Sequence, residues 1–103
     1  MLRHLLDRSD RENSAGGAKL RPARDVLTAE KDGLAVLLDL RRAVYFGLDE
    51  VGTAAWREIE NGATAAMIAS RIAEEYDAPT DAVKEDMQRF IDELRRRRLV
   101  VTA

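Results

Sequence analysis

The stretch that decides the fold reads LDLRRAVYFGLDEVG and runs from Leu38 to Gly52. Its centre, Ala43–Leu48, is rich in β-branched and aromatic residues, which is typical of a β-strand. Asp49 follows directly, and a short side-chain acceptor at this place is a common N-cap of a helix. The stretch therefore predicts a strand that leads straight into a helix.

Two further strands are expected before this one, at Val26–Ala29 and Leu34–Asp39. The residues between them include Asp32-Gly33, and Asp-Gly between apolar runs is a strong hairpin signal. Arg41-Arg42 marks the turn into the third strand. Residues 26–48 are therefore predicted to form a three-stranded antiparallel sheet.

Three amphipathic helices are expected after the sheet, at residues 50–61, 64–76 and 80–97. Gly62 is suited to end the first helix, and Thr64 and Thr80 are placed to cap the next two. A short closing strand is expected at residues 99–101. The predicted fold class is α+β, with a winged helix-turn-helix-like arrangement of a three-stranded antiparallel sheet followed by three helices. Trp56 and Phe90 fall on apolar stripes, which predicts that both belong to the core.

Composition divides the 103-residue chain into two parts. Residues 1–24 are polar and glycine-bearing with a net charge of +3, and we expect a flexible N-terminal extension there. Residues 25–103 carry a net charge of −5 and form the expected folded domain. No apolar run is long enough to span a membrane, and residues 1–6 are too short and too charged for a signal peptide, so a cytoplasmic location is expected.

Catalytic motifs are missing from the folded part. The chain has no cysteine, and its one histidine is His4, in the expected extension. Without a neighbouring base no serine is activated as a nucleophile, and no phosphate-binding, dinucleotide or calcium-loop pattern occurs. The sequence therefore indicates a protein that is not an enzyme and that needs no cofactor or metal.

A winged-helix DNA-binding regulator is the alternative from a different class. The third helix argues against it, because residues 80–93 carry a net charge of −3 and would meet a phosphate backbone with repulsion. The run Arg95–Arg98 is explained by the preference for cations in the last turn of a helix. A different use of the fold follows from the third strand, which has no charge or proline to block its edge. An open edge beside an amphipathic helix is a receptor for an extended peptide.

Short matches in a fixed order resemble the PqqD-type domain, over about residues 25–101. They are Leu38-Asp39; Tyr45-Phe46-x-Leu48-Asp49-x-x-Gly52; Trp56; Gly62-x-Thr64-x-x-x-Ile68-Ala69; Asp86-Met87-x-x-Phe90-Ile91-x-x-Leu94; and Leu99-Val100. The chain departs from the family in having Asp49 where asparagine is frequent and Arg98 where glycine is frequent before the last apolar pair.

The resemblance implies a non-catalytic module that recognises the leader of a ribosomally made precursor peptide, a RiPP recognition element. Such domains hold the leader as an added strand between the third strand and the third helix. Free-standing members of this size are typical of lasso-peptide pathways, where a partner cysteine protease removes the leader. A PqqD-like chaperone for another peptide-modifying enzyme, such as a radical enzyme, stays open as an alternative.

The expected peptide-binding residues lie on these two elements. On the strand, Ala43, Val44, Tyr45, Phe46 and Gly47 would supply the pairing edge, with Tyr45 as the best side-chain contact. On the third helix, the expected groove residues are Val83, Asp86, Met87 and Phe90. Val83, Met87 and Phe90 are expected to serve the core and the groove together. We expect Asp86 to pair with a basic leader residue. No nucleic acid or membrane is expected as a partner.

Overall fold

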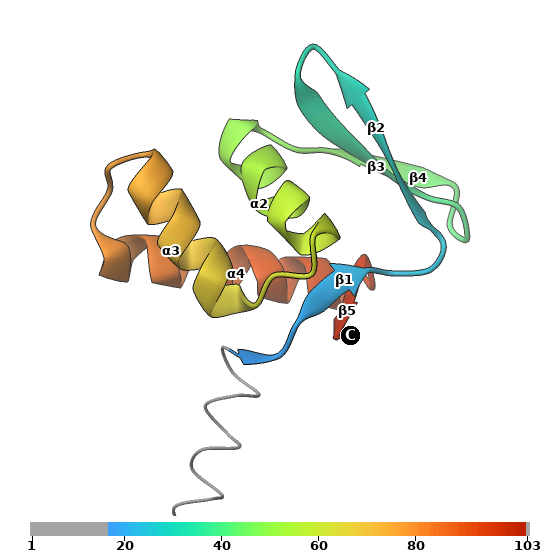
Figure 1. The fold of residues 1–103 in the computed structure, drawn as a ribbon. Helices are drawn as coiled ribbons and strands as arrows, with labels where there is room; N and C mark the ends of the chain where they lie inside the picture. Colours follow the sequence, from blue (N-terminus) through green and yellow to red (C-terminus); the bar gives the residue numbers. More distant parts are fainter. Residues whose placement is uncertain (1–16, 103) are drawn as a thin grey trace, which may run out of the picture.

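The computed structural model describes residues 17–102, and within this range it contains five short strands and three helices (Figure 1). In chain order these are β1 (Leu20–Pro22), β2 (Val26–Lys31), β3 (Leu34–Asp39), β4 (Val44–Gly47), α2 (Glu50–Glu60), α3 (Ala65–Glu75), α4 (Thr80–Arg96) and β5 (Val100–Thr102).

The strands β2, β3 and β4 form an antiparallel sheet in that order. Asp32 and Gly33 connect the first two strands, with φ angles of 55° and 82°. Positive φ at both positions is the geometry of a tight hairpin turn, which explains why the Asp-Gly pair predicts it. The three-stranded sheet is confirmed, and β4 is one of its two edges.

Side-chain caps start two of the helices. Asp49 Oδ1 accepts a hydrogen bond of 2.7 Å from the backbone N–H of Gly52, and Thr64 Oγ1 accepts one of 3.1 Å from Met67. The prediction that Thr80 caps the third helix is wrong. Thr80 is already the first helical residue of α4, and Pro79, which has no hydroxyl, stands at the cap.

Helix α2 packs on the inner face of the sheet, with α3 on its other side and α4 running beneath it (Figure 1). Trp56 is 0% exposed, and its indole N–H donates to Thr28 Oγ1 of β2 at 2.8 Å. The hydroxyl of Thr53 accepts from the backbone N–H of Ala35 in β3 at 2.9 Å. The prediction that Trp56 belongs to the core is confirmed, and α2 fixes the sheet against the helices.

The expected boundary after residue 24 lies too late in the chain. Leu20 is fully buried in the core, and β1 pairs antiparallel with β5, so the folded domain already includes residues 20–24. This pairing could not be predicted from the sequence, because the three residues Leu-Arg-Pro are too few to show the alternating pattern of a strand. The rest of the expected extension, residues 1–16 with His4, lies outside the described residues.

Two classes of feature are missing from residues 17–102. None of the helices there is both long and apolar enough to cross a bilayer. The same residues hold no cluster of three or more acidic or imidazole side chains in an arrangement that would bind a metal ion.

Candidate peptide-binding site

The outer edge of β4 presents unused backbone groups. Leu48 donates its backbone N–H to the carbonyl of Ala35 in β3 at 2.9 Å. In an antiparallel ladder the backbone direction alternates along the strand, so Val44 and Phe46 also face β3. The N–H and C=O groups of Tyr45 and Gly47 therefore point away from the sheet. Among residues 17–102, no further strand pairs with this edge.

A buried carboxylate shapes the turn that leads into β4. Asp39 is 1% exposed, and its Oδ1 accepts hydrogen bonds from the backbone N–H groups of Arg41 and Arg42 at 3.1 and 3.3 Å. Its Oδ2 lies 3.9 Å from Arg42 Nη1. The turn ends at Ala43, whose φ of 58° is left-handed. Ala43 was expected in the strand, but the structure places it in the turn, and the strand begins at Val44.

The side chains of β4 differ in exposure. Tyr45 is 74% exposed on the outer face, as expected from its alternation with its neighbours. Val44 is exposed as well, whereas Phe46 is half-buried and packs against the core. Gly47 is exposed, and a Cβ added to it would meet nothing within 4 Å. The edge is therefore open to an approaching backbone.

A hollow of about 170 Å³ lies between β4 and α4, directly beside this edge. A dry cavity of about 150 Å³ can hold a benzene ring, so this hollow is large enough for one aromatic or branched side chain. Its lining is mostly apolar and consists of Leu37, Phe46, Gly47, Leu48, Phe90, Glu93, Leu94, Arg97 and Leu99.

An ion pair and a cation–π contact form one wall of the hollow. The guanidinium of Arg97 lies 5.0 Å from the centroid of the Phe46 ring, and its Nε donates to Glu93 Oε2 at 2.7 Å. The hydrogen bond from Arg97, together with the charges of Arg96 and Arg97, lowers the pKa of Glu93 below its usual value, although desolvation opposes the shift. Glu93 is therefore ionised at neutral pH and holds Arg97 over the ring.

The expected helix residues separate into three groups. Phe90 is half-buried, packs against the core and also lines the hollow. Val83 and Met87 are only 7% and 6% exposed and belong to the core. Asp86 is exposed one turn before Phe90, where it pairs with Arg89 at 2.7 Å, and it does not line the hollow.

Sequence reasoning missed Glu93 and Arg97 as groove residues. Both follow Phe90 at helical spacing, three and seven residues later, and this periodicity could have identified them. Their charge instead suggested a solvated helix face.

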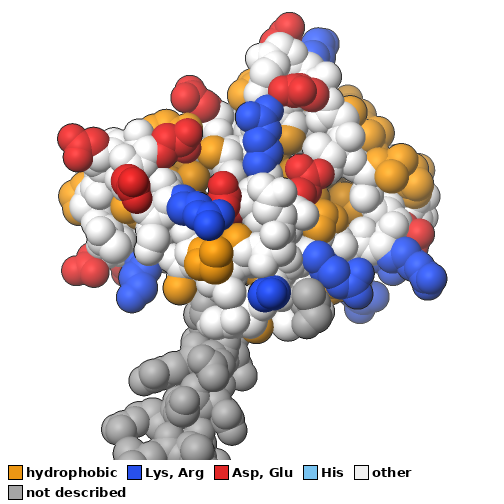
Figure 2. Space-filling model, in the orientation of Figure 1, with side chains coloured by type: hydrophobic (Ala, Val, Ile, Leu, Met, Phe, Trp, Pro, Cys, Tyr) orange, Lys and Arg blue, Asp and Glu red, His pale blue; other side chains and the backbone are white. Residues whose placement is uncertain are grey.

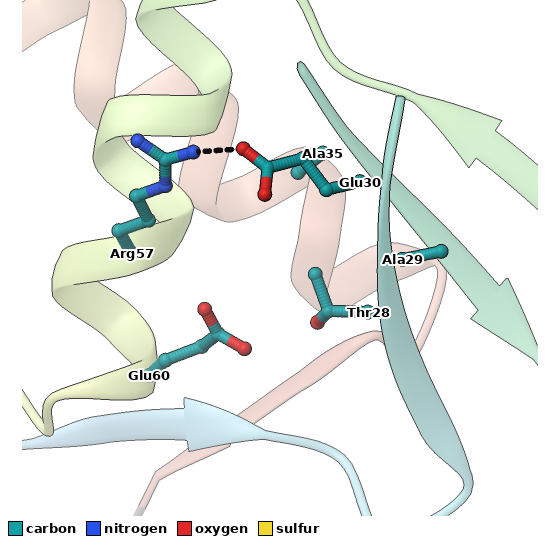
Figure 3. A pocket seen from close by; sticks show the side chains of 6 residues that line it. All are labelled: Thr28, Ala29, Glu30, Ala35, Arg57 and Glu60. Atoms are coloured by element: carbon teal, nitrogen blue, oxygen red, sulfur yellow. Dashed lines mark hydrogen bonds and ion pairs between the residues drawn. The ribbon is translucent and has the colours of Figure 1, made fainter. Parts of the chain in front are cut away.

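A second hollow, of about 210 Å³, lies between β2 and α2 (Figure 3). Figure 3 shows Glu30 and Arg57 pointing toward one another across it, with Nη2 of Arg57 2.8 Å from Oε1 of Glu30. The hydroxyl of Thr28 is already used by Trp56. The Glu30–Arg57 ion pair and the Trp56–Thr28 hydrogen bond connect β2 to α2 around this hollow.

The family model described as coenzyme PQQ synthesis protein D (PqqD) matches residues 35–100. The chain belongs to the PqqD family. The match covers β4, nearly all of β3 and all three helices. It thus includes both walls of the candidate groove, by which we mean the edge of β4 together with the hollow between β4 and α4. A search of curated proteins found no match for this PqqD-family domain.

Three solved structures resemble this PqqD-family domain. TbiB1 in complex with the TbiA(beta) leader peptide is 32% identical, with a TM-score of 0.74 over 78% of this chain and 93% of that chain. A lasso peptide synthetase B1 complexed with the leader peptide is 21% identical, with a TM-score of 0.75 over 82% and 99% of the two chains. The PqqD truncation of Methylobacterium extorquens PqqCD, a stand-alone RiPP recognition element, is 22% identical, with a TM-score of 0.66 over 81% and 88%. The last two matches support the fold.

Proposed function

We propose that this domain recognises the leader segment of a ribosomally made precursor peptide and binds it as an added strand at the edge of β4. The observation that carries the proposal is the unused edge itself. Tyr45 and Gly47 direct their backbone groups outward, next to a hollow large enough for one apolar side chain. Main-chain pairing would supply affinity, and the hollow would supply specificity.

The relatives support this assignment. TbiB1, 32% identical over most of both chains, is known in complex with the TbiA(beta) leader peptide. A lasso peptide synthetase B1, solved with a leader peptide, has the same fold. We therefore assign the domain to a peptide-modifying pathway, with lasso-peptide synthesis as the first choice.

The role of the bound domain would be presentation. The described residues contain no Ser–His or Cys–His pair, since the chain has no cysteine and its one histidine is His4. A separate enzyme, a leader peptidase of the cysteine protease class or another modifying enzyme, would act on the precursor while this domain holds its leader.

A titration with two kinds of ligand tests the proposal. Labelled leader peptides, the TbiA(beta) leader and the leader of this chain's own precursor, are compared with scrambled peptides and with a DNA duplex by fluorescence anisotropy. We expect at least one leader to bind more tightly than its scrambled version, and the duplex not to bind. Tighter binding of the duplex, or no preference for either leader, would contradict the assignment.

A further inference from the structure

A further hollow, distinct from the two described above, lies at the C-terminal end of α4 and is strongly basic. It has a volume of about 390 Å³ and is built from three separate segments: the connection between β1 and β2, the β3–β4 turn, and the end of α4 with β5. Figure 2 shows Lys and Arg side chains gathered below the three-stranded sheet, at the end away from the β2–β3 hairpin. The lining residues are Ala23, Arg24, Asp25, Arg41, Arg95, Arg98, Val100 and Val101.

The charges of this hollow are poorly balanced. Four guanidinium groups face one carboxylate, and that carboxylate, Asp25, lies 3.6 Å from Nε of Arg41. Within residues 17–102, Arg24, Arg95 and Arg98 form no ion pair. Like charges held together disfavour the compact state unless a partner neutralises them.

The helix dipole does not explain this arrangement. Favourable interaction with the dipole applies to cations in the last turn of α4, such as Arg95. Arg24 and Arg41 come from other segments, and Arg98 lies beyond the helix with a φ of 57°. The fold has thus brought arginines from three places around one hollow with an apolar floor of Val100 and Val101.

The surroundings select a short acidic peptide over a nucleic acid. The solvent-facing side of α4 carries Asp81, Glu85 and Asp92, all exposed, and these repel a long polyanion that crosses the helix. A short run of carboxylates can bind at the basic hollow without crossing the acidic side of α4. Arginine pairs well with carboxylates because its planar group donates two parallel hydrogen bonds.

The basic hollow adjoins the leader groove. Arg97 lines the groove, while Arg95 and Arg98 line the hollow, so both sites use residues 95–98 at the C-terminal end of α4. Nη1 of Arg42 donates to the carbonyl of Arg97 at 3.0 Å and ties the β3–β4 turn to the same place. A peptide strand that pairs with β4 and continues past Val44 arrives at this turn.

We infer that this hollow binds an acidic segment of the precursor peptide, next to the segment that pairs with β4, and thereby selects precursors with carboxylates at that position. The inference rests on the proposed function for its choice of peptide. The chemistry it requires, several carboxylates on an extended chain, follows from the arginines alone.

The first test uses a capped hexaglutamate peptide as a probe of the hollow, with capped hexaglutamine as control. An NMR titration of the labelled full chain should shift the amides of residues 23–25, 41 and 95–101, and should leave the turn at 32–33 unchanged. The double variant Arg24→Gln/Arg95→Gln should weaken binding by about tenfold. Neither side chain forms an ion pair in the described structure, so the fold should persist.

A matched variant controls for net charge. Arg71→Gln/Arg89→Gln removes two arginines from α3 and α4 outside the hollow and should leave hexaglutamate binding within about twofold. Equal weakening by both double variants would show general attraction and overturn the inference. Tighter binding of a DNA duplex than of hexaglutamate, lost in Arg24→Gln/Arg95→Gln, would also overturn it.

A second test addresses the source of the acidic segment. Leader peptides found to bind are extended with triglutamate or triglutamine at either end. One triglutamate extension should bind about tenfold more tightly than its triglutamine partner, and the gain should vanish in Arg24→Gln/Arg95→Gln. If leaders bind but neither extension helps, the inference fails and the proposed function stands. If hexaglutamate binds the hollow but no leader binds the chain, the proposed function fails instead.

Discussion

At the scale of single residues, Trp56 joins the sheet to the helices. Its ring is fully buried, and its N–H is satisfied by Thr28 across the interface between α2 and β2. A large buried aromatic residue with its one polar atom paired contributes both packing and orientation.

We therefore expect Trp56→Ala to lower the free energy of unfolding by about 3–5 kcal/mol. Tyr45→Ala removes an exposed ring and should change it by less than about 0.5 kcal/mol. Urea denaturation followed by circular dichroism measures both. An unchanged urea midpoint for Trp56→Ala would contradict a stabilising role of Trp56 in the core.

Ala43 adopts a backbone conformation that glycine tolerates better. Its φ of 58° carries a steric cost of roughly 1–2 kcal/mol for a residue with a Cβ. Ala43→Gly should raise the free energy of unfolding by up to about 1 kcal/mol, since part of the gain is lost to the greater freedom of the unfolded chain.

The matched control is the reverse change in the other hairpin. Gly33 has a φ of 82° and open space around it, so Gly33→Ala tests the backbone effect without a clash. It should lower stability by about 1 kcal/mol. Urea denaturation measures both variants. A loss of stability in Ala43→Gly would show that the backbone at Ala43 is not strained.

At the scale of elements, β1 shows that a very short strand can belong to the core. Its three residues pair with β5, and Leu20 contacts the buried cluster under α2. The backbone N–H of Leu20 donates to the carbonyl of Ala63 at 3.0 Å, which ties the strand to the connection between α2 and α3.

Two deletions separate β1 from the residues before it. Removing residues 1–16 should leave leader affinity within about threefold, because this polar stretch has no apolar pattern that could add a binding surface. Removing residues 1–22 also deletes Leu20 and should lower the free energy of unfolding by at least about 2–5 kcal/mol. Thermal melts and leader titrations read both effects, and equal stability of the two deletions would show that β1 is dispensable.

The edge of β4 gives a more selective test, because the direction of each N–H is known. The N–H of Gly47 points outward, so Gly47→Pro removes a donor that the sheet does not use. This variant should remain folded and lose leader binding by tenfold or more, about 1.4 kcal/mol.

Phe46→Pro is the comparison, because the N–H of Phe46 faces β3 and its loss breaks the ladder. It should destabilise the whole domain. Undiminished leader binding by folded Gly47→Pro would show that the leader does not pair with this edge.

At the scale of the whole molecule, the sequence patterns predicted the sheet and the three helices because each element has a clear periodicity. The cap at Asp49 and the turn at Asp32-Gly33 follow from local chemistry and could be predicted as well. The pairing of β1 with β5 joins residues about eighty positions apart, and no local pattern records it.

The residues of the candidate site could be proposed from the sequence only in part, because some of its contacts join distant segments. The strand residues were proposed from their edge position, and Phe90 from its spacing on α4. Whether Val83 and Met87 face the groove or the core depends on how α4 packs against its neighbours, and the structure shows them in the core. Arg97 belongs to the groove because Glu93 and the Phe46 ring hold it there, a contact between distant segments.

Amide hydrogen exchange on addition of a binding leader peptide tests the central claim most directly. The amides of Tyr45 and Gly47 should gain protection, because an added strand would accept their outward hydrogen bonds. The amides of Val44 and Phe46 already face β3 and should change little, as should Asp32 and Gly33 in the far turn. New protection confined to α3, with none at Tyr45 and Gly47, would contradict strand addition at β4.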